Sequence, residues 1–230
     1  MDAKFSLAST AALIADPGRA AMLTSLLDGR ALAAGELARA ANVSPQSASM
    51  HLSQLLEGGL VKVAQDGRHR YYQIASPEVA HAVEALGVIA SPRKRKPLGE
   101  GDPICYARTC YDHLAGTMAV SLAESLLQRR YLVACVDSDH EFDVTVTGED
   151  FFRQWRIDVN ELRSKTRSFA RRCLDWTERR DHVAGALGAA ICQRFLELRW
   201  IVRDRNSRIV RVTPSGRRHL EELIHGPAAA

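Results

Sequence analysis

Two sets of side chains in this sequence have the types and spacing for chemistry. The first set follows Asn42 and consists of Ser44, Gln46, Ser47, Ser49, His51 and Gln54. Their hydroxyl, amide and imidazole groups form hydrogen bonds to base edges and phosphates, and a glutamine can bind adenine through two such bonds. Together with Arg68, His69, Arg70 and Tyr72 further along the chain, these side chains predict contacts with DNA.

The second set consists of cysteines and histidines, and no cysteine precedes residue 105. Cys110 lies three residues before His113, and Cys173 lies nine residues before His182. Because zinc and soft metal ions prefer thiolate and imidazole ligands, these four side chains predict a Cys2His2 effector or metal site where the fold brings them together. We expect each cysteine near a helix start, which would lower its pKa and also favour oxidation. The alternative is that the cysteines fill the core and the histidines cap helices or pair with adjacent aspartates.

Helix and turn signals predict the elements that position the first set. Apolar periodicity predicts helices over residues 9–15, 17–27, 33–41, 45–57 and 77–88. Asp16 and Ser44 each precede a proline and are expected to cap the helices that follow. Strands are predicted over residues 60–64 and 71–75, with Asp66-Gly67 favouring a hairpin between them. This order predicts a winged helix-turn-helix whose helix over residues 45–57 enters the major groove.

Several short segments of residues 5–90 also carry a family resemblance. They are Ala15-Asp16-Pro17-Gly18-Arg19, Gly35-Glu36-Leu37-Ala38, the run from Val43 to Leu52, the run from Leu55 to Val61, and the run from Gly67 to Tyr72. This part of the chain resembles the ArsR/SmtB-type transcriptional repressors. The resemblance implies a homodimer, built by the first and last helices of the domain, that occupies operator DNA and leaves it when an inducer binds. Met50 departs from the family pattern, which often has a polar or basic residue there.

An internal repeat covers residues 108–155 and 172–224. Apolar residues at four-residue steps occur at Leu114, Met118, Leu122 and Leu126, and again at Val183, Leu187, Ile191 and Phe195. In each repeat this helix is followed by a strand, a polar turn and a second strand, the latter over residues 144–148 and 210–216. We interpret the region as two degenerate winged-helix units. The predicted fold class is therefore mainly α with small β-hairpin wings (α+β).

The basic run Arg93-Lys94-Arg95-Lys96 lies between two prolines and marks a linker over residues 91–103. It divides a DNA-binding and dimerisation domain, residues 1–90, from a sensor domain, residues 104–230. Because the net charge of +4 is concentrated in this run, whole-chain charge does not by itself indicate nucleic acid. We interpret the run as a solvated hinge, with additional phosphate contacts as the alternative.

These observations predict a sequence-specific repressor, released by an effector that the C-terminal domain senses. The effector is a metal ion, a thiol oxidant, or a small molecule near Tyr111 and Trp176. The sequence has no nucleophile elbow, phosphate loop or dinucleotide motif, so no enzyme is expected. The alternatives are a thiol-redox or ligand-binding enzyme module with an accessory winged helix, and a structural protein that binds DNA without sequence preference. The cysteine pattern and the lack of a long apolar run predict a cytoplasmic protein without membrane contact.

Overall fold

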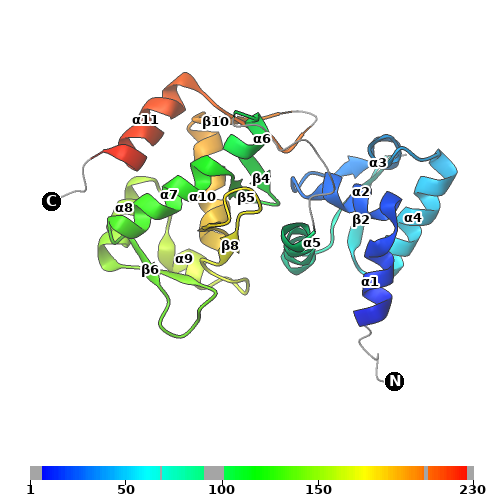
Figure 1. Cartoon of the computed structure of the whole chain (residues 1–230), viewed down its shortest axis with the longest axis horizontal. Helices are drawn as coiled ribbons and strands as arrows, with labels where there is room; N and C mark the ends of the chain where they lie inside the picture. The colour runs from blue at the N-terminus through cyan, green and yellow to red at the C-terminus, as the bar shows by residue number, and fades with distance from the viewer. Residues whose placement is uncertain (1–6, 68, 91–100, 205–206, 227–230) are drawn as a thin grey trace. The chain divides into compact units, whose positions relative to one another are not determined.

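The amphipathic segments of the N-terminal part fold as helices in the computed structural model, which describes residues 7–67, 69–90, 101–204 and 207–226. The chain forms two units, residues 1–87 and residues 88–230, which are described separately (Figure 1). Residues 91–100, which hold most of the predicted linker, and the predicted wing residue Arg68 lie outside the described residues. Within the described ranges, no helix has the length and apolarity needed to cross a bilayer.

The first unit has the helix and strand order of a winged helix-turn-helix. Its elements are α1 (Leu7–Ala15), α2 (Pro17–Leu26), β1 (Leu32–Ala33), α3 (Ala34–Ala41), α4 (Pro45–Glu57), β2 (Val61–Asp66), β3 (His69–Ile74) and α5 (Pro77–Ile89). Both predicted caps are present: Asp16 Oδ1 accepts a hydrogen bond of 2.9 Å from the backbone N–H of Arg19, and Ser44 Oγ accepts one of 3.2 Å from that of Ser47. The predicted fold of this unit is confirmed.

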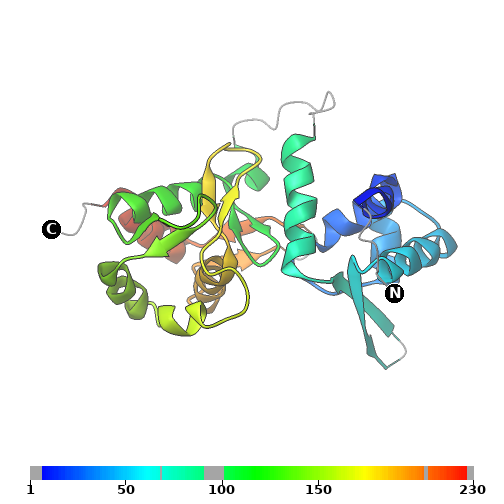
Figure 2. The ribbon, with the colours of Figure 1, turned by 90° about the horizontal axis from the view of Figure 1, so that it is seen from below.

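A three-stranded sheet with the order β1-β3-β2 completes the first unit. The pairing of β2 with β3 continues to Asp66 and His69, so the strands are longer, and the turn shorter, than predicted. The hairpin projects away from the helices of its unit (Figure 2). Strand β1, which no sequence signal indicated, pairs Leu32 with Tyr72 and fixes the other edge of β3. The sheet therefore holds the hairpin as a wing beside α4.

The second unit repeats one arrangement, a hairpin, a helix, a second hairpin and a second helix. The first copy consists of β4 (Arg108–Cys110), β5 (His113–Ala115), α7 (Thr117–Gln128), β6 (Leu132–Ala134), β7 (Phe142–Val144) and α8 (Val146–Gln154). The second copy consists of β8 (Arg172–Leu174), β9 (Asp181–Val183), α10 (Gly185–Glu197), β10 (Ile201–Arg203), β11 (Val210–Val212) and α11 (Pro214–His225). The short helices α6 (Pro103–Tyr106) and α9 (Val159–Arg163) precede the two copies.

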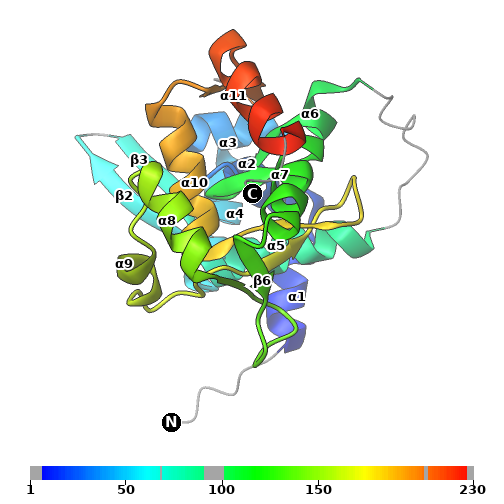
Figure 3. The ribbon, with the colours of Figure 1, turned by 90° about the vertical axis from the view of Figure 1, so that its left-hand side faces the viewer.

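The two copies share one hydrophobic core, in which α11 of the second copy packs against α7 of the first (Figure 3). Equivalent residues make equivalent contacts: Thr145 caps α8 and Thr213 caps α11, each by accepting a 3.0 Å hydrogen bond from a glycine N–H. A Cβ on either glycine, Gly148 or Gly216, would lie 2.1 or 2.0 Å from a backbone carbonyl oxygen. These caps correct the predicted strands over 144–148 and 210–216, whose second halves begin helices.

Candidate nucleic-acid interface and cysteine–histidine cluster

The exposed start of α4 carries four of the predicted DNA-contacting side chains. Ser44, Gln46 and Ser49 are exposed, and Ser47 is half-buried. The hydroxyl groups of Ser44 and Ser47 lie 3.0 Å apart, and Ser49 Oγ donates a 3.0 Å hydrogen bond to the backbone oxygen of Pro45. Gln46 lies in the first turn, the part of a recognition helix that contacts base edges. This end of α4 is therefore suited to hydrogen bonding in a groove.

Two predicted contacts on α4 instead bind other side chains of the first unit. His51 is only 9% exposed, and its Nδ1 lies 3.7 Å from Asp16 Oδ1 at the start of α2. Gln54 Oε1 accepts a hydrogen bond from Arg19, whose guanidinium also donates to two backbone carbonyls of α1. These partners argue against the predicted DNA contacts of both residues. His51 and Gln54 hold α4 against the helices that precede it.

The wing presents His69 and Arg70, both exposed, near the end of the β2–β3 hairpin. The Arg70 guanidinium lies 5.5 Å from the centre of the Tyr72 ring. Tyr72 itself is 5% exposed and lies on the central strand β3, opposite Leu32 of β1 and Val63 of β2. Its burial argues against the predicted phosphate contact and gives it a structural role under Arg70. The two basic side chains are suited to phosphates or a minor groove.

The four predicted ligands Cys110, His113, Cys173 and His182 come together in the second unit. Cys110 is paired with His113 across the β4–β5 hairpin, and Cys173 with His182 across β8–β9. Their ligand atoms all lie within 4.8 Å of one another. None of the four residues is more than 5% exposed. We call this group the Cys2His2 cluster.

The cluster lies on strands, which corrects the expectation that each cysteine is near a helix start. The helices begin later, at Thr117 and Gly185, and the backbone has a positive φ just before α7 at Gly116 (92°) and at the first residue of α10, Gly185 (76°). A Cβ at Gly116 would lie 2.5 Å from the backbone oxygen of Cys105, and one at Gly185 would lie 2.6 Å from that of Ser168. Glycine, which has no Cβ, allows both the positive φ and these close backbone contacts, so each hairpin can be followed directly by a helix.

Each histidine of the cluster has an aspartate beside Nδ1. His113 Nδ1 lies 3.3 Å from Asp112 Oδ1, and His182 Nδ1 lies 3.4 Å from Asp175 Oδ2. Such carboxylates orient an imidazole and favour the tautomer whose Nε2 carries a lone pair. The two Nε2 atoms face each other at 3.2 Å. The sequence indicated the adjacent Asp112, but it did not indicate Asp175, which is seven residues from His182.

Asp175 also joins the two repeats through a buried ion pair. Its Oδ1 accepts a 2.8 Å hydrogen bond from Arg108 Nη2, and the two side chains are 0% and 1% exposed. Its Oδ2 accepts a 2.7 Å bond from the backbone N–H of Gly116, at the start of α7. The Arg108 guanidinium lies over the Trp176 ring, 4.4 Å from its centre. Trp176 is one of the two residues of the predicted small-molecule site. The pKa of Asp175 is held well below its usual range by Arg108 and by its hydrogen bonds, although burial opposes the shift.

The Cys2His2 cluster favours a thiolate at Cys173. A hydrogen bond with Cys110 is the main cause that holds the pKa of Cys173 far below its usual range, and His113 and His182 lower it further against the effect of burial. Burial lowers the pKa of His113, but hydrogen bonds with Asp112 and Cys173 outweigh it and the net pKa is raised. A thiolate is the form of cysteine that binds metals and reacts with oxidants.

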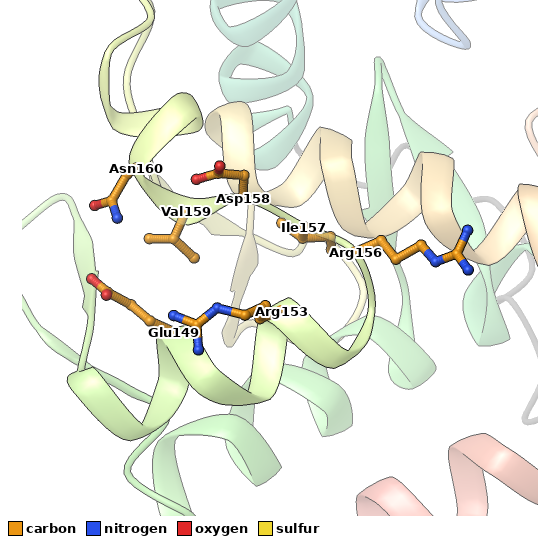
Figure 4. A pocket seen from close by; sticks show the side chains of 7 residues that line it. All are labelled: Glu149, Arg153, Arg156, Ile157, Asp158, Val159 and Asn160. Carbon is orange, nitrogen blue, oxygen red and sulfur yellow. The ribbon is translucent and has the colours of Figure 1, made fainter.

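A cavity of about 360 Å³ opens beside α8 and α9 of the second unit (Figure 4). It is lined by Glu149, Arg153, Arg156, Ile157, Asp158, Val159 and Asn160. Glu149 is paired with Arg163 at 2.5 Å, and Arg153 with Asp150. Neither Tyr111 nor Trp176 lines this cavity, so it is separate from the predicted small-molecule site. Its charged side chains have both signs, and Glu149 and Arg153 are already in ion pairs. The cavity therefore indicates no particular class of ligand.

Comparisons with known proteins agree with the winged helix of the first unit. Residues 14–64 match the model of a helix-turn-helix domain family. An uncharacterized HTH-type transcriptional regulator of Bacillus subtilis, YdfF, is 46% identical over 223 residues, which cover 96% of this chain and 97% of YdfF.

Two solved structures match a smaller part of the chain. NolR from Sinorhizobium fredii is 33% identical, with a TM-score of 0.33, over 36% of this chain and 81% of NolR. A homodimeric winged helix-turn-helix domain from Mycobacterium bovis, described as a possible ArsR-family regulator, is 30% identical, with a TM-score of 0.33, over 36% of this chain and 75% of that domain. With a near full-length relative of this kind, the chain belongs to the helix-turn-helix transcriptional regulators.

Proposed function

We propose that this regulator is a homodimeric, sequence-specific repressor that works in the cytoplasm and leaves its operator when the second unit binds an effector. The observation that carries the proposal is that one small unit has both a polar helix start and a basic wing. Gln46 and its neighbouring serines are exposed on α4, and His69 and Arg70 are exposed on the wing. Side chains of the first kind read base edges, and those of the second hold phosphates or enter a minor groove.

A homodimer is supported by the apolar surface of the two terminal helices of the first unit. No residue of α1 is buried, and Leu7 is 73% exposed. On α5, Leu86 is 43% exposed, and Val79 and Val83 on the same face are only half-buried. Two copies joined through these helices would present two α4 helices to half-sites one helical turn apart.

An effector-sensing role for the second unit is supported by what that unit contains. It has its own hydrophobic core and a buried cluster of thiol and imidazole groups, neither of which DNA contact requires. An effector can release DNA only by binding the non-binding conformation more tightly than the DNA-binding one. The classes of effector that remain open are a metal ion, a thiol oxidant and a small molecule.

Replacing Gln46 with alanine is expected to change which operator sequences the protein prefers. Selection from random DNA with the full chain should first yield a defined operator, and the Gln46→Ala variant should then lose discrimination by about 1–3 kcal/mol at one base position in each half-site. Gln193→Ala is the matched control, because it removes the same amide from an exposed position on α10 of the second unit. That control should keep the preference of the parent. A selection that yields no common sequence would favour a structural protein without sequence preference.

Replacing Arg70 with alanine is expected to weaken binding to all DNA sequences alike. Because each subunit of the dimer loses one phosphate contact, the plot of log affinity against log salt concentration should become shallower by about 1.8 units. The measurement is a salt titration of affinity for operator and random duplexes. Arg217→Ala removes the same charge from an exposed position on α11 and should leave the slope unchanged. An unaltered slope in Arg70→Ala would remove this residue from the DNA interface.

A further inference from the structure

We propose that Cys110, His113, Cys173 and His182 bind one zinc ion in a closed, four-coordinate site that fastens the two repeats together. Each repeat supplies one cysteine and one histidine, paired across one hairpin. The proposal concerns the second unit alone and does not depend on how the first unit recognises DNA. It therefore goes beyond the repressor function proposed above.

The spacing of the ligand atoms fits a tetrahedral zinc site. With Zn–N bonds of about 2.05 Å and Zn–S bonds of about 2.3 Å, the edges of such a tetrahedron measure about 3.3–3.8 Å. The His113 and His182 Nε2 atoms are 3.2 Å apart, close to the edge expected between two nitrogen ligands. All four ligand atoms lie within 4.8 Å of one another, so about 1 Å of side-chain adjustment closes the widest edge.

The orientation of the imidazoles also fits a cation bound to both rings. Asp112 and Asp175 lie beside the Nδ1 atoms, which favours a proton on each Nδ1 and a lone pair on each Nε2. Two lone pairs that face each other at 3.2 Å repel, and either a proton on one of them, which forms a hydrogen bond, or a metal ion bound to both removes the repulsion. A metal ion held by both Nε2 atoms removes this repulsion and leaves each Nδ1 atom beside its carboxylate.

The charges of the buried site balance when zinc is bound. Two thiolates and two neutral imidazoles carry a charge of −2, which one Zn²⁺ neutralises, so no net charge is left in the interior. The two aspartates are neutralised separately, Asp112 by Arg167 at 2.6 Å and Asp175 by Arg108 at 2.8 Å. Because all four ligands come from the protein and are buried, no position is open to substrate, which is typical of structural zinc sites.

Such an ion would join two repeats that already pack against each other. Helix α10 of the second repeat packs against β5 of the first, and α7 of the first packs against β9 of the second. At one of these contacts, a Cβ added to Gly188 on α10 would lie 3.2 Å from the Cβ of His113. Both hairpins thus lie on the helix of the other repeat. An ion with ligands from both hairpins would join the two repeats by direct metal–ligand bonds.

The test measures metal content in the full chain, purified under reducing conditions without chelator and without DNA. We expect about one zinc ion per chain by elemental analysis, as a four-ligand site requires. Cobalt substituted for zinc should give thiolate-to-cobalt charge-transfer bands and the intense visible bands of tetrahedral coordination. Removing the ion with a chelator should lower the thermal unfolding midpoint by about 10 °C or more, since a ligand that binds only the folded state stabilises it.

Variants distinguish the site from adventitious binding. Cys173→Ser and His182→Ala should each lose the stoichiometric zinc and the tetrahedral cobalt spectrum. Cys192→Ser is the matched control, because Cys192 is also a buried, free cysteine but lies outside the cluster. This control should retain both signals even where it lowers stability.

Three results would overturn the proposal. The first is a folded parent protein that stays below about 0.1 zinc per chain after incubation with excess zinc, where a filled structural site holds one. The second is metal content unchanged in both Cys173→Ser and His182→Ala. The third is a Cys110–Cys173 disulfide, found by mass spectrometry in protein kept under reductant. Each can occur while DNA binding is normal, so failure of the metal site is distinguishable from failure of the repressor proposal.

Discussion

Replacing Asp175 with alanine is expected to lower the free energy of unfolding of the second unit by about 3–5 kcal/mol, the usual cost of removing one partner of a buried ion pair. Arg108 is 1% exposed and would keep its charge without the carboxylate that neutralises it. The backbone N–H of Gly116 and the Thr177 hydroxyl would lose their acceptor as well. The Cys2His2 cluster would also lose the carboxylate beside His182 Nδ1.

The measurement is denaturant unfolding of the full chain, followed by tryptophan fluorescence, since all three tryptophans lie in the second unit. Asp143→Ala is the control, because it breaks the ion pair of Asp143 with Arg163, in which the aspartate side chain is 51% exposed. That change is expected to cost below about 1 kcal/mol. Asp175→Ala combined with Arg108→Met should destabilise by less than the sum of the two single changes, because the double variant leaves no buried charge unpaired. A loss below about 1 kcal/mol in Asp175→Ala would contradict a structural role for the ion pair.

The local signals in the sequence were sufficient to predict the first unit. Proline after a capping residue marked the starts of α2 and α4, and both caps are present. The burial of His51 follows from its position on the helix, which residue type alone does not indicate. His51 lies three residues after buried Ala48 and four before buried Leu55, so the helical period places it on the core face.

In the second unit the repeat predicted the partners of the Cys2His2 cluster, but not the elements that hold them. Residues 108–115 form a hairpin because Gly116, with a positive φ, separates it from α7, and a three-residue strand has too little periodicity to be recognised. The sequence also does not indicate the partner of His182. The adjacent Asp181 pairs with Arg172, and Asp175, seven residues away, lies beside the imidazole. Contacts of this kind depend on tertiary packing and have no local signature.

Replacing Leu86 with glutamate is expected to convert the regulator into a monomer and to weaken its operator affinity by about 10²–10⁴-fold. Two DNA-binding units in one dimer bind two half-sites as a single event, and this factor is what linkage of two binding sites typically contributes. Leu86 is 43% exposed on α5 and lies on the same helix face as Val79 and Val83. A carboxylate buried there in both subunits would place two negative charges in an apolar interface.

Sedimentation velocity at micromolar concentration without DNA measures the assembly, and fluorescence anisotropy with a labelled operator measures the affinity. Ala85→Glu is the matched control: it adds the same charge to an exposed position of α5, about a third of a turn away from the apolar face. The control should remain a dimer and should lose affinity only through the added charge, an effect that salt screens. A Leu86→Glu dimer that binds the operator as tightly as Ala85→Glu would exclude α5 from the interface. A parent chain that sediments as a monomer would overturn the dimer itself, and each operator half-site would then have to be bound independently.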